Sequence, residues 1–185
     1  MRARLRHRFI LALSLVVGWA EAARAKVYLT PAEAARLAFG PEATVAEEQQ
    51  VVTPAMRATL ERRLGRPVPE DAFTFSVGRS AHGVDGYGLV LQEMGKHEPI
   101  TLFVAVTPDG QVKDVMVLEY RESRGGEVRY HGFLKQYVGK TSRDPLELDE
   151  DITPITGATI SARALSEGVK KALAVWELFY QSAKR

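Results

Sequence analysis

Residues 100–120 read ITLFVAVTPDGQVKDVMVLEY, and this stretch indicates two strands joined by a tight turn. Residues 100–106 and 112–120 are rich in β-branched and other apolar side chains, which favour strands. Pro108, Asp109 and Gly110 lie between them, and each of these residue types suits a different position of a turn. The stretch therefore predicts an antiparallel hairpin.

Two further strands are predicted upstream of this hairpin. Phe73, Phe75 and Val77 alternate with small or polar residues, and residues 87–94 form another mainly apolar run. A loop containing Gly83 and Gly86 is expected between the two. Sequential strands with short connections favour an antiparallel sheet.

Two helices are predicted before the strands. Thr30-Pro31 and Thr53-Pro54 each place an N-cap residue before a proline at the first helical position. Gly40 and Gly65 are the expected helix ends.

Downstream of the hairpin we expect a short helix at 131–138, a polar loop at 140–154 and a long helix at 161–180. The last helix carries one apolar stripe, formed by Ala162, Leu165, Val169, Leu173, Trp176 and Tyr180. The predicted fold class is therefore α+β, a twisted antiparallel sheet packed with helices.

The first 25 residues are predicted to be a cleaved secretory signal peptide, which would export the protein to the periplasm. Arginines at positions 2, 4, 6 and 8 precede an apolar or neutral run at 9–19, and Ala23-Arg24-Ala25 offers a cleavage site. The alternative is an uncleaved anchor in the inner membrane, although the run is shorter than the roughly 20 apolar residues that cross a bilayer.

Charge and composition exclude several classes of function. The chain has 25 basic and 23 acidic residues, which become 20 and 22 when residues 1–25 are removed. This balance gives no support for nucleic-acid or anionic-membrane binding. The absence of cysteine excludes disulfides, thiolate metal sites and cysteine nucleophiles, so redox chemistry would need a non-thiol cofactor.

No metal site or hydrolase motif is predicted. His82, His97 and His131 lack the spacing of metal ligands. A Gly-x-Ser-x-Gly nucleophile motif is also absent from the sequence.

Thr156-Gly157-Ala158-Thr159 lies where the polar loop meets the last helix. The first turn of a helix leaves N–H groups unpaired and carries partial positive charge, so a phosphate is stabilised there. The hydroxyl of Thr159 is a weak nucleophile that an outside enzyme would have to activate. The alternative is an ordinary helix start, in which Thr156, Thr159 and Ser161 serve as turn and cap residues.

The same four residues resemble the flavinylation motif of the FMN-binding domain family. That family includes the C subunit of the sodium-translocating NADH:quinone reductase and the G subunit of the Rnf electron-transport complex. Residues 120–127, YRESRGGE, look like its glutamate-and-glycine loop. Residues 133–140, FLKQYVGK, look like its Phe-x-x-Gln-[Phe/Tyr]-x-Gly-Lys element. The resemblance covers residues 86–174.

The resemblance implies FMN at the N-terminus of the last long helix, attached through a phosphodiester to Thr159 as phosphothreonyl-FMN. Further cofactor contacts are expected from residues around this threonine and from the upstream loop, namely Glu122, Gly125, Gly126, Thr156, Gly157, Ala158, Ile160 and Ser161. The chain then divides into a signal peptide at 1–25, an N-terminal helical segment at 26–72 and an FMN-binding domain at 73–185.

The function that the resemblance implies is electron transfer by FMN in an envelope redox chain, rather than enzymatic turnover. The implied partners are a membrane or periplasmic redox protein and a flavin transferase that uses FAD and magnesium. Two alternatives are a non-redox binding module that has kept the fold without the flavin, and a flavin-dependent reductase of a small soluble acceptor.

Two details bear on these alternatives. The family usually places an aspartate six residues before the acceptor threonine, where this sequence has Thr153, with acidic residues at 149–151 just upstream. In addition, Gly125-Gly126 with the arginines at 121, 124 and 129 is either a phosphate-binding loop at the flavin edge or a solvated turn.

Overall fold

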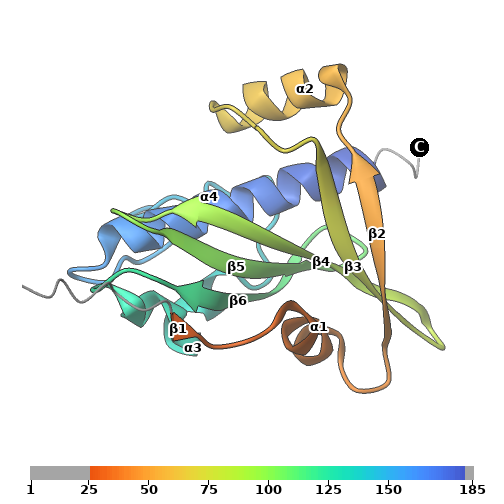
Figure 1. Ribbon diagram of the computed structural model, residues 1–185, viewed down its shortest axis with the longest axis horizontal. Coiled ribbons are helices and arrows are strands. Elements are labelled where there is room, and N and C mark those ends of the chain that lie inside the picture. The colour runs from red at the N-terminus through yellow and green to blue at the C-terminus, as the bar shows by residue number, and fades with distance from the viewer. Residues whose placement is uncertain (1–25, 182–185) are drawn as a thin grey trace, which may run out of the picture.

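A six-stranded antiparallel sheet forms the centre of the protein in a computed structural model that describes residues 26–181 (Figure 1). Its strands are β1 (Lys26–Val27), β2 (Thr44–Val51), β3 (Ala72–Ser80), β4 (Gly83–Met94), β5 (Pro99–Val106) and β6 (Val112–Tyr120). They lie in the order β1-β6-β5-β4-β3-β2. Strands β2 to β6 therefore form a meander, and β1 pairs with β6 at one edge. The signal-peptide prediction falls on residues 1–25, outside the described residues.

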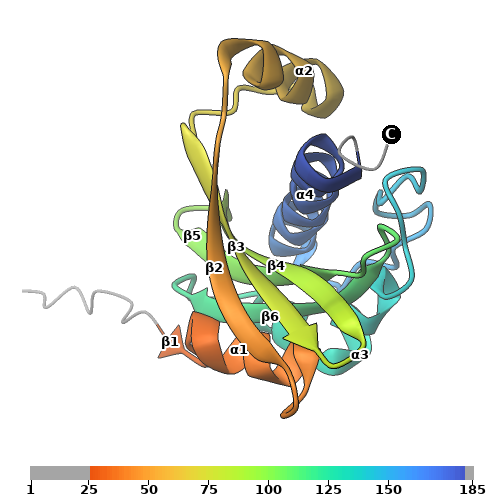
Figure 2. The ribbon, with the colours of Figure 1, turned by 90° about the vertical axis from the view of Figure 1, so that its right-hand side faces the viewer.

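Helices cover both faces of this sheet. They are α1 (Pro31–Phe39), α2 (Pro54–Leu64), α3 (His131–Leu134) and α4 (Thr159–Trp176), with short 3-10 turns at Gly126–Arg129 and Lys135–Tyr137 and a π-helical turn at Glu177–Gln181. Helix α4 lies along one face against β4 and β5, while α1 lies on the opposite face (Figure 2). The predicted α+β class, with a twisted antiparallel sheet and covering helices, is confirmed. Within residues 26–181 no helix has the length and apolar character needed to cross a membrane.

The two N-terminal helices begin and end where the sequence predicts. At α1, the Thr30 hydroxyl accepts the Glu33 N–H at 3.2 Å and the Glu33 carboxylate accepts the Thr30 N–H at 2.7 Å, which forms a capping box. At α2, Thr53 accepts the Met56 N–H at 3.3 Å, and the chain leaves the helix at Gly65 with φ 66°. These helices depend on local signals.

The strands differ from the prediction in two places. The segment 26–72, expected to be helical, also supplies β1 and β2 to the sheet. The expected loop at Gly83 and Gly86 is wrong, because β4 begins at Gly83 and Gly86 pairs with Gly78 of β3. A Cβ added at Gly78 or Gly86 would lie 2.5 or 2.8 Å from the Phe39 ring, so these glycines allow α1 to approach the sheet closely.

The main core lies between α4 and the sheet. The α4 residues of the predicted stripe, Ala162, Leu165, Val169, Leu173 and Trp176, are all buried against it. Beyond Trp176, Tyr180 lies 4.1 Å from the Tyr87 ring and 4.9 Å from the Phe75 ring between centroids. The C-terminal end of α4 is therefore fixed in an aromatic cluster formed by Phe75, Tyr87, Trp176 and Tyr180.

Candidate functional site at the start of the last helix

Helix α4 begins at Thr159 and has no side-chain cap. Its N-cap residue is Ala158, which offers no side-chain acceptor, and Gly157 before it has φ 82°. Of the alternative in which Thr156, Thr159 and Ser161 serve as turn and cap residues, the capping part is therefore wrong, although Thr156 does lie in the turn before the helix. The first-turn N–H groups of this 18-residue helix are left without side-chain acceptors, and they carry the positive end of the helix dipole.

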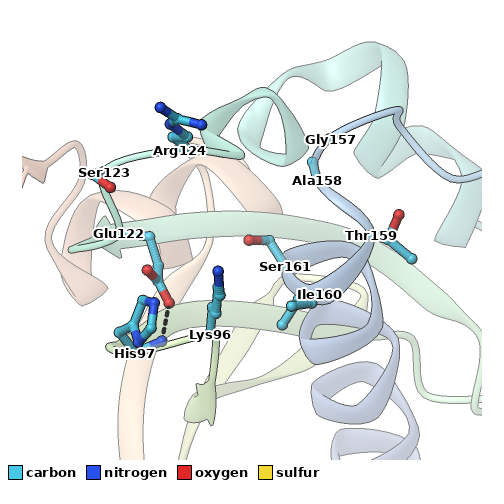
Figure 3. Close-up of a pocket in the computed structure, with 10 residues that line it drawn as sticks. All are labelled: Lys96, His97, Glu122, Ser123, Arg124, Gly157, Ala158, Thr159, Ile160 and Ser161. Atoms are coloured by element: carbon cyan, nitrogen blue, oxygen red, sulfur yellow. Dashed lines mark hydrogen bonds between the residues drawn. The ribbon is translucent and has the colours of Figure 1, made fainter.

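A cavity of about 610 Å³ opens at this helix start (Figure 3). Three segments line it: the turn between β4 and β5, the chain after β6, and the first residues of α4. The lining residues are Lys96, His97, Glu122, Ser123, Arg124, Gly157, Ala158, Thr159, Ile160 and Ser161. Segments that lie far apart in the sequence therefore meet here.

The structure brings together most of the predicted site residues. Glu122 and residues 157–161 line the cavity, whereas Gly125, Gly126 and Thr156 lie beside it without lining it. Four lining residues were missed, namely Lys96, His97, Ser123 and Arg124. The first two lie in the β4–β5 turn, which reaches the site because Ile100 of β5 pairs with Tyr120 of β6. The predicted β5–β6 hairpin contained this signal, since residues before 100 must then lie near residues after 120.

Thr159 and Ile160 both line the cavity, and in Figure 3 the Ile160 side chain is directed towards Lys96 whereas the Thr159 side chain is directed away from it. Both residues are exposed, and Ile160 retains 46% of its accessible surface. Within residues 26–181 the Thr159 hydroxyl forms no side-chain hydrogen bond, and Ala158 before it is buried. The first turn thus carries an exposed threonine and an exposed apolar side chain that point in different directions.

Glu122 uses its carboxylate to hold the β4–β5 turn. Its Oε1 accepts the N–H of His97 at 2.5 Å and that of Glu98 at 3.1 Å. Burial opposes the charged form, but the backbone N–H groups of His97 and Glu98 outweigh burial and lower the pKa of Glu122. A Cβ on Gly95 would lie 2.7 Å from the same oxygen. Glu122 is therefore an ionised carboxylate that is already bonded to protein.

Tyr120 joins the loop after β6 to α4, and sequence reasoning gave it no such part. Its hydroxyl donates to the Arg124 carbonyl at 2.5 Å and lies 2.8 Å from the Ser161 Oγ. Gly125, with φ 81°, packs against this contact, because a Cβ there would lie 3.0 Å from the Tyr120 hydroxyl and 3.1 Å from the Ser161 Oγ. Ser161, predicted to contact the cofactor, has its buried hydroxyl bonded within the protein.

The arginines of the predicted phosphate-binding loop point to different places. Arg121 forms an ion pair with Glu119 and donates to the Pro99 carbonyl at 3.2 Å. Arg129 stacks on the ring of Tyr130, with its guanidinium 4.3 Å from the centroid. Of the three, Arg124 alone lines the cavity. Of the two alternatives left open for this loop, a phosphate-binding loop that uses all three arginines is not formed, and only Arg124 is placed to contact a ligand in the cavity.

The polar loop that leads into α4 is fixed by three contacts from residues 136–140. The Gln136 side-chain amide accepts the Thr153 N–H at 2.8 Å and donates to the Thr153 carbonyl at 3.2 Å. Lys140 forms an ion pair with Asp151 at 2.8 Å. Tyr137, fully buried, has its hydroxyl 3.0 Å from the Ser166 Oγ on α4. These contacts position the approach to Thr159.

Metal ligation finds no structural support in the described part of the chain. Among residues 26–181, no group of three or more His, Cys, Asp or Glu side chains could hold a metal ion.

Residues 95–174 match the family model of the FMN-binding domain. This part of the chain therefore resembles an FMN-binding domain. The match includes the β4–β5 turn, the chain after β6, the bracing residues 136–140 and most of α4. The predicted resemblance and the predicted cofactor, FMN, are confirmed.

Two curated relatives align with parts of the chain. The G subunit of the proton-translocating ferredoxin:NAD(+) oxidoreductase complex of Clostridium ljungdahlii is 34% identical over 95 residues, which are 47% of this chain and 51% of that protein. The G subunit of the Na(+)-translocating ferredoxin:NAD(+) oxidoreductase complex of Acetobacterium woodii is 23% identical over 128 residues, 64% of this chain and 62% of that protein. The chain thus spans about half to three fifths of these relatives.

Solved structures of the same fold include the same subunit of sodium-translocating NADH-quinone reductase from two bacteria. The C subunit from Parabacteroides distasonis superposes with a TM-score of 0.54 at 14% identity, over 75% of this chain and 79% of that chain. NqrC from Shewanella oneidensis gives 0.52 at 17% identity, over 72% and 71%. At these identities the likeness establishes the fold.

The cavity at the start of α4 fits FMN. Its volume of about 610 Å³ lies in the range of roughly 300–1,000 Å³ that is usual for small-molecule sites. The uncapped start of α4 suits the phosphate, and the exposed Ile160 side chain offers an apolar surface to the ring system. The residues present therefore match both the anionic and the apolar part of FMN.

Proposed function

We propose that this protein is an exported electron-transfer flavoprotein whose FMN is attached to Thr159 through a phosphodiester. The observation that carries the proposal is the accessible Thr159 hydroxyl at the uncapped start of α4, within an FMN-binding domain. A phosphodiester there would bring its negative charge to the first-turn N–H groups. The bound FMN would supply the redox chemistry, while the chain supplies position and electrostatics.

The attachment requires a flavin transferase, because a threonine hydroxyl is a weak nucleophile at neutral pH. The Thr159 oxygen would form a bond to the flavin-side phosphorus of FAD as AMP leaves with the electron pair, and the hydroxyl would lose its proton. Ser161 does not compete as an acceptor in this proposal, since its hydroxyl is buried and lies 2.8 Å from the Tyr120 hydroxyl.

The proposed redox partner is a membrane or periplasmic protein. The curated relatives are named as subunits of ferredoxin:NAD(+) oxidoreductase complexes that translocate protons or sodium ions, which supports a partner of this kind. Export rests on the basic, apolar and small-residue regions of residues 1–25.

The backbone conformation of the loop before Thr159 is held without the side chain of Thr153. The Gln136 side chain accepts the backbone N–H of Thr153 and donates to its carbonyl, and these two hydrogen bonds hold the loop. The path from this loop to Thr159 therefore does not depend on the side chain at position 153. Asp151, the acidic neighbour nearest in sequence, is engaged with Lys140.

Intact-mass spectrometry of the full chain coexpressed with a flavin transferase tests the attachment. We expect the mass to rise by one FMN less one water in the natural protein and in Thr159→Ser. No adduct is expected in Thr159→Ala, while the exposed Thr74→Ala on β3, far from the cavity, should be modified normally. An unmodified natural chain, or an adduct that persists in Thr159→Ala, would overturn the assignment.

A further inference from the structure

The β4–β5 turn places a cation in the wall of the cavity. Lys96 lines the cavity, and its side chain rises from the turn towards the level of Glu122 and Ile160 (Figure 3). Within residues 26–181 no carboxylate forms an ion pair with Lys96. Its ammonium group is therefore available to a ligand in the cavity.

The conformation of the turn is fixed by Glu122. The carboxylate accepts the N–H groups of His97 and Glu98. Gly95 is required for this approach, because a Cβ at that position would meet both the Glu122 carboxylate and the Glu98 carbonyl at under 3.0 Å. The negative charge of Glu122 is thus used to hold the turn that carries Lys96.

The other charged side chains at the cavity are less well placed to act on a bound ring. Arg124 also lines the cavity, but its guanidinium extends away from Glu122, Ile160 and Ser161 in Figure 3. His97 lies next to Glu122 on the turn. Lys96 and Ile160, by contrast, together offer an ammonium group, an aliphatic stem and an apolar side chain.

We propose that Lys96 is the residue that favours the reduced form of FMN in this site, and that Glu122 is the positioning residue that holds Lys96 in place. The proposal rests on the proposed function. When bound, FMN would supply a ring that accepts two electrons from the proposed redox partner and one proton from solvent, and the reduced ring would carry one negative charge. A nearby cation stabilises this charged product more than the neutral oxidised ring, so Lys96 raises the equilibrium constant for reduction.

The test is a reductive titration of the flavin-loaded full chain with dithionite against a reference dye. In Lys96→Gln we expect the equilibrium constant for reduction to fall by about three- to tenfold, as the loss of one partly screened charge predicts. A tenfold fall corresponds to about 30 mV for a two-electron couple. Lys96→Arg should retain the natural value. So should Lys135→Gln, since Lys135 is exposed and does not line the cavity.

The role of Glu122 is tested by combining substitutions. Glu122→Ala should lower the equilibrium constant for reduction, as Lys96→Gln does. The double variant Lys96→Gln with Glu122→Ala should have the same constant as Lys96→Gln alone. Glu122→Gln, whose amide oxygen still accepts the turn N–H groups, should not lower it. A rise in Glu122→Ala would mean that its own charge acts on the flavin, and it would overturn the positioning role.

Two further outcomes are distinguishable. A loaded Lys96→Gln protein with an unchanged constant would overturn the role of Lys96 and leave the proposed function standing. A natural chain that takes up no flavin at all, seen as the absence of flavin absorbance before any titration, would overturn the proposed function and the inference with it.

Discussion

The two ends of α4 differ in burial and in the kind of side chain that surrounds them. At the C-terminal end, Trp176 is 2% exposed, and the aromatic cluster continues into Tyr180, which lies 4.9 Å from the Phe75 ring. At the N-terminal end, Thr159 and Ile160 are exposed and no side chain caps the helix. The helix has 18 residues and is about 27 Å long at 1.5 Å per residue. It thus has a buried aromatic end at its C-terminus and an open end, exposed and uncapped, at its N-terminus.

This difference separates stability from chemistry along a single helix. Buried apolar area is the main favourable contribution to folding, and the residues of α4 that bury such area lie between Ala162 and Trp176. Because this packing holds the helix, its first turn can leave N–H groups open to a ligand without a cap. A helix held by its termini alone would not have that freedom.

The largest effect on the free energy of unfolding is expected at the buried aromatic end of α4. Trp176→Ala should lower the free energy of unfolding by about 3–5 kcal/mol, because it leaves a large cavity in the aromatic cluster. Urea unfolding followed by circular dichroism measures the loss. Ile160→Ala at the open end, which removes a side chain that is 46% exposed, is the matched control and should cost under about 1 kcal/mol. Equal losses at both ends would contradict the division.

An intermediate effect is expected where the open end is joined to the loop after β6. Tyr120→Phe removes the hydroxyl that serves both the Arg124 carbonyl and Ser161. The buried Ser161 hydroxyl then lacks its partner, and we expect a loss of about 1–2 kcal/mol. The double variant Tyr120→Phe with Ser161→Ala should recover part of this loss in urea unfolding, since no unpaired Ser161 hydroxyl remains. A larger loss in the double variant would sink this account.

The smallest effect is expected from the ion pair that braces the approach to Thr159. Burial opposes the charge of Asp151, but Lys140 and the N–H groups of Glu147 and Leu146 outweigh burial and lower its pKa from the usual 3.8. Because the pKa of Asp151 is lower in the folded than in the unfolded protein, its charge stabilises the fold at any pH above the unfolded-state pKa. This contribution is lost as the pH falls through the folded-state pKa. Asp151→Asn should therefore unfold with a shallower pH dependence below about pH 4. The measurement is the urea midpoint of unfolding as a function of pH. An equally steep fall of this midpoint at acid pH in Asp151→Asn and in the natural protein would contradict the prediction.

The predictability of the fold followed the range of the interactions that make each element. Helices α1 and α2 have their caps and stops within a few residues, so Thr30 and Gly65 were sufficient signals. Strand β2 was missed because TVAEEQQV has few strongly strand-forming residues and contains two Glu, a residue type that is depleted in strands. It forms by pairing along its length with β3, a long-range contact that local patterns do not contain.

The part of the site that could be predicted consists of residues that belong to short sequence motifs. The residues at 157–161 and Glu122 belong to recognisable motifs, and all of them line the cavity. Lys96 and His97 carry no motif and arrive through the register of β5 with β6. The functions of Tyr120, Gly125 and Gln136 as braces also emerge only in three dimensions, because each depends on a partner at least 17 residues away, such as Ser161 or Thr153.

The contact between Gln136 and Thr153 has a consequence for how this position can vary. Both hydrogen bonds are made to main-chain atoms of Thr153, and the residue itself is exposed. Any residue with a backbone N–H can satisfy them, so the side chain at position 153 is uncoupled from the geometry of the loop. A substitution there would change the exposed surface next to the approach to Thr159, while the two hydrogen bonds beneath it would be kept.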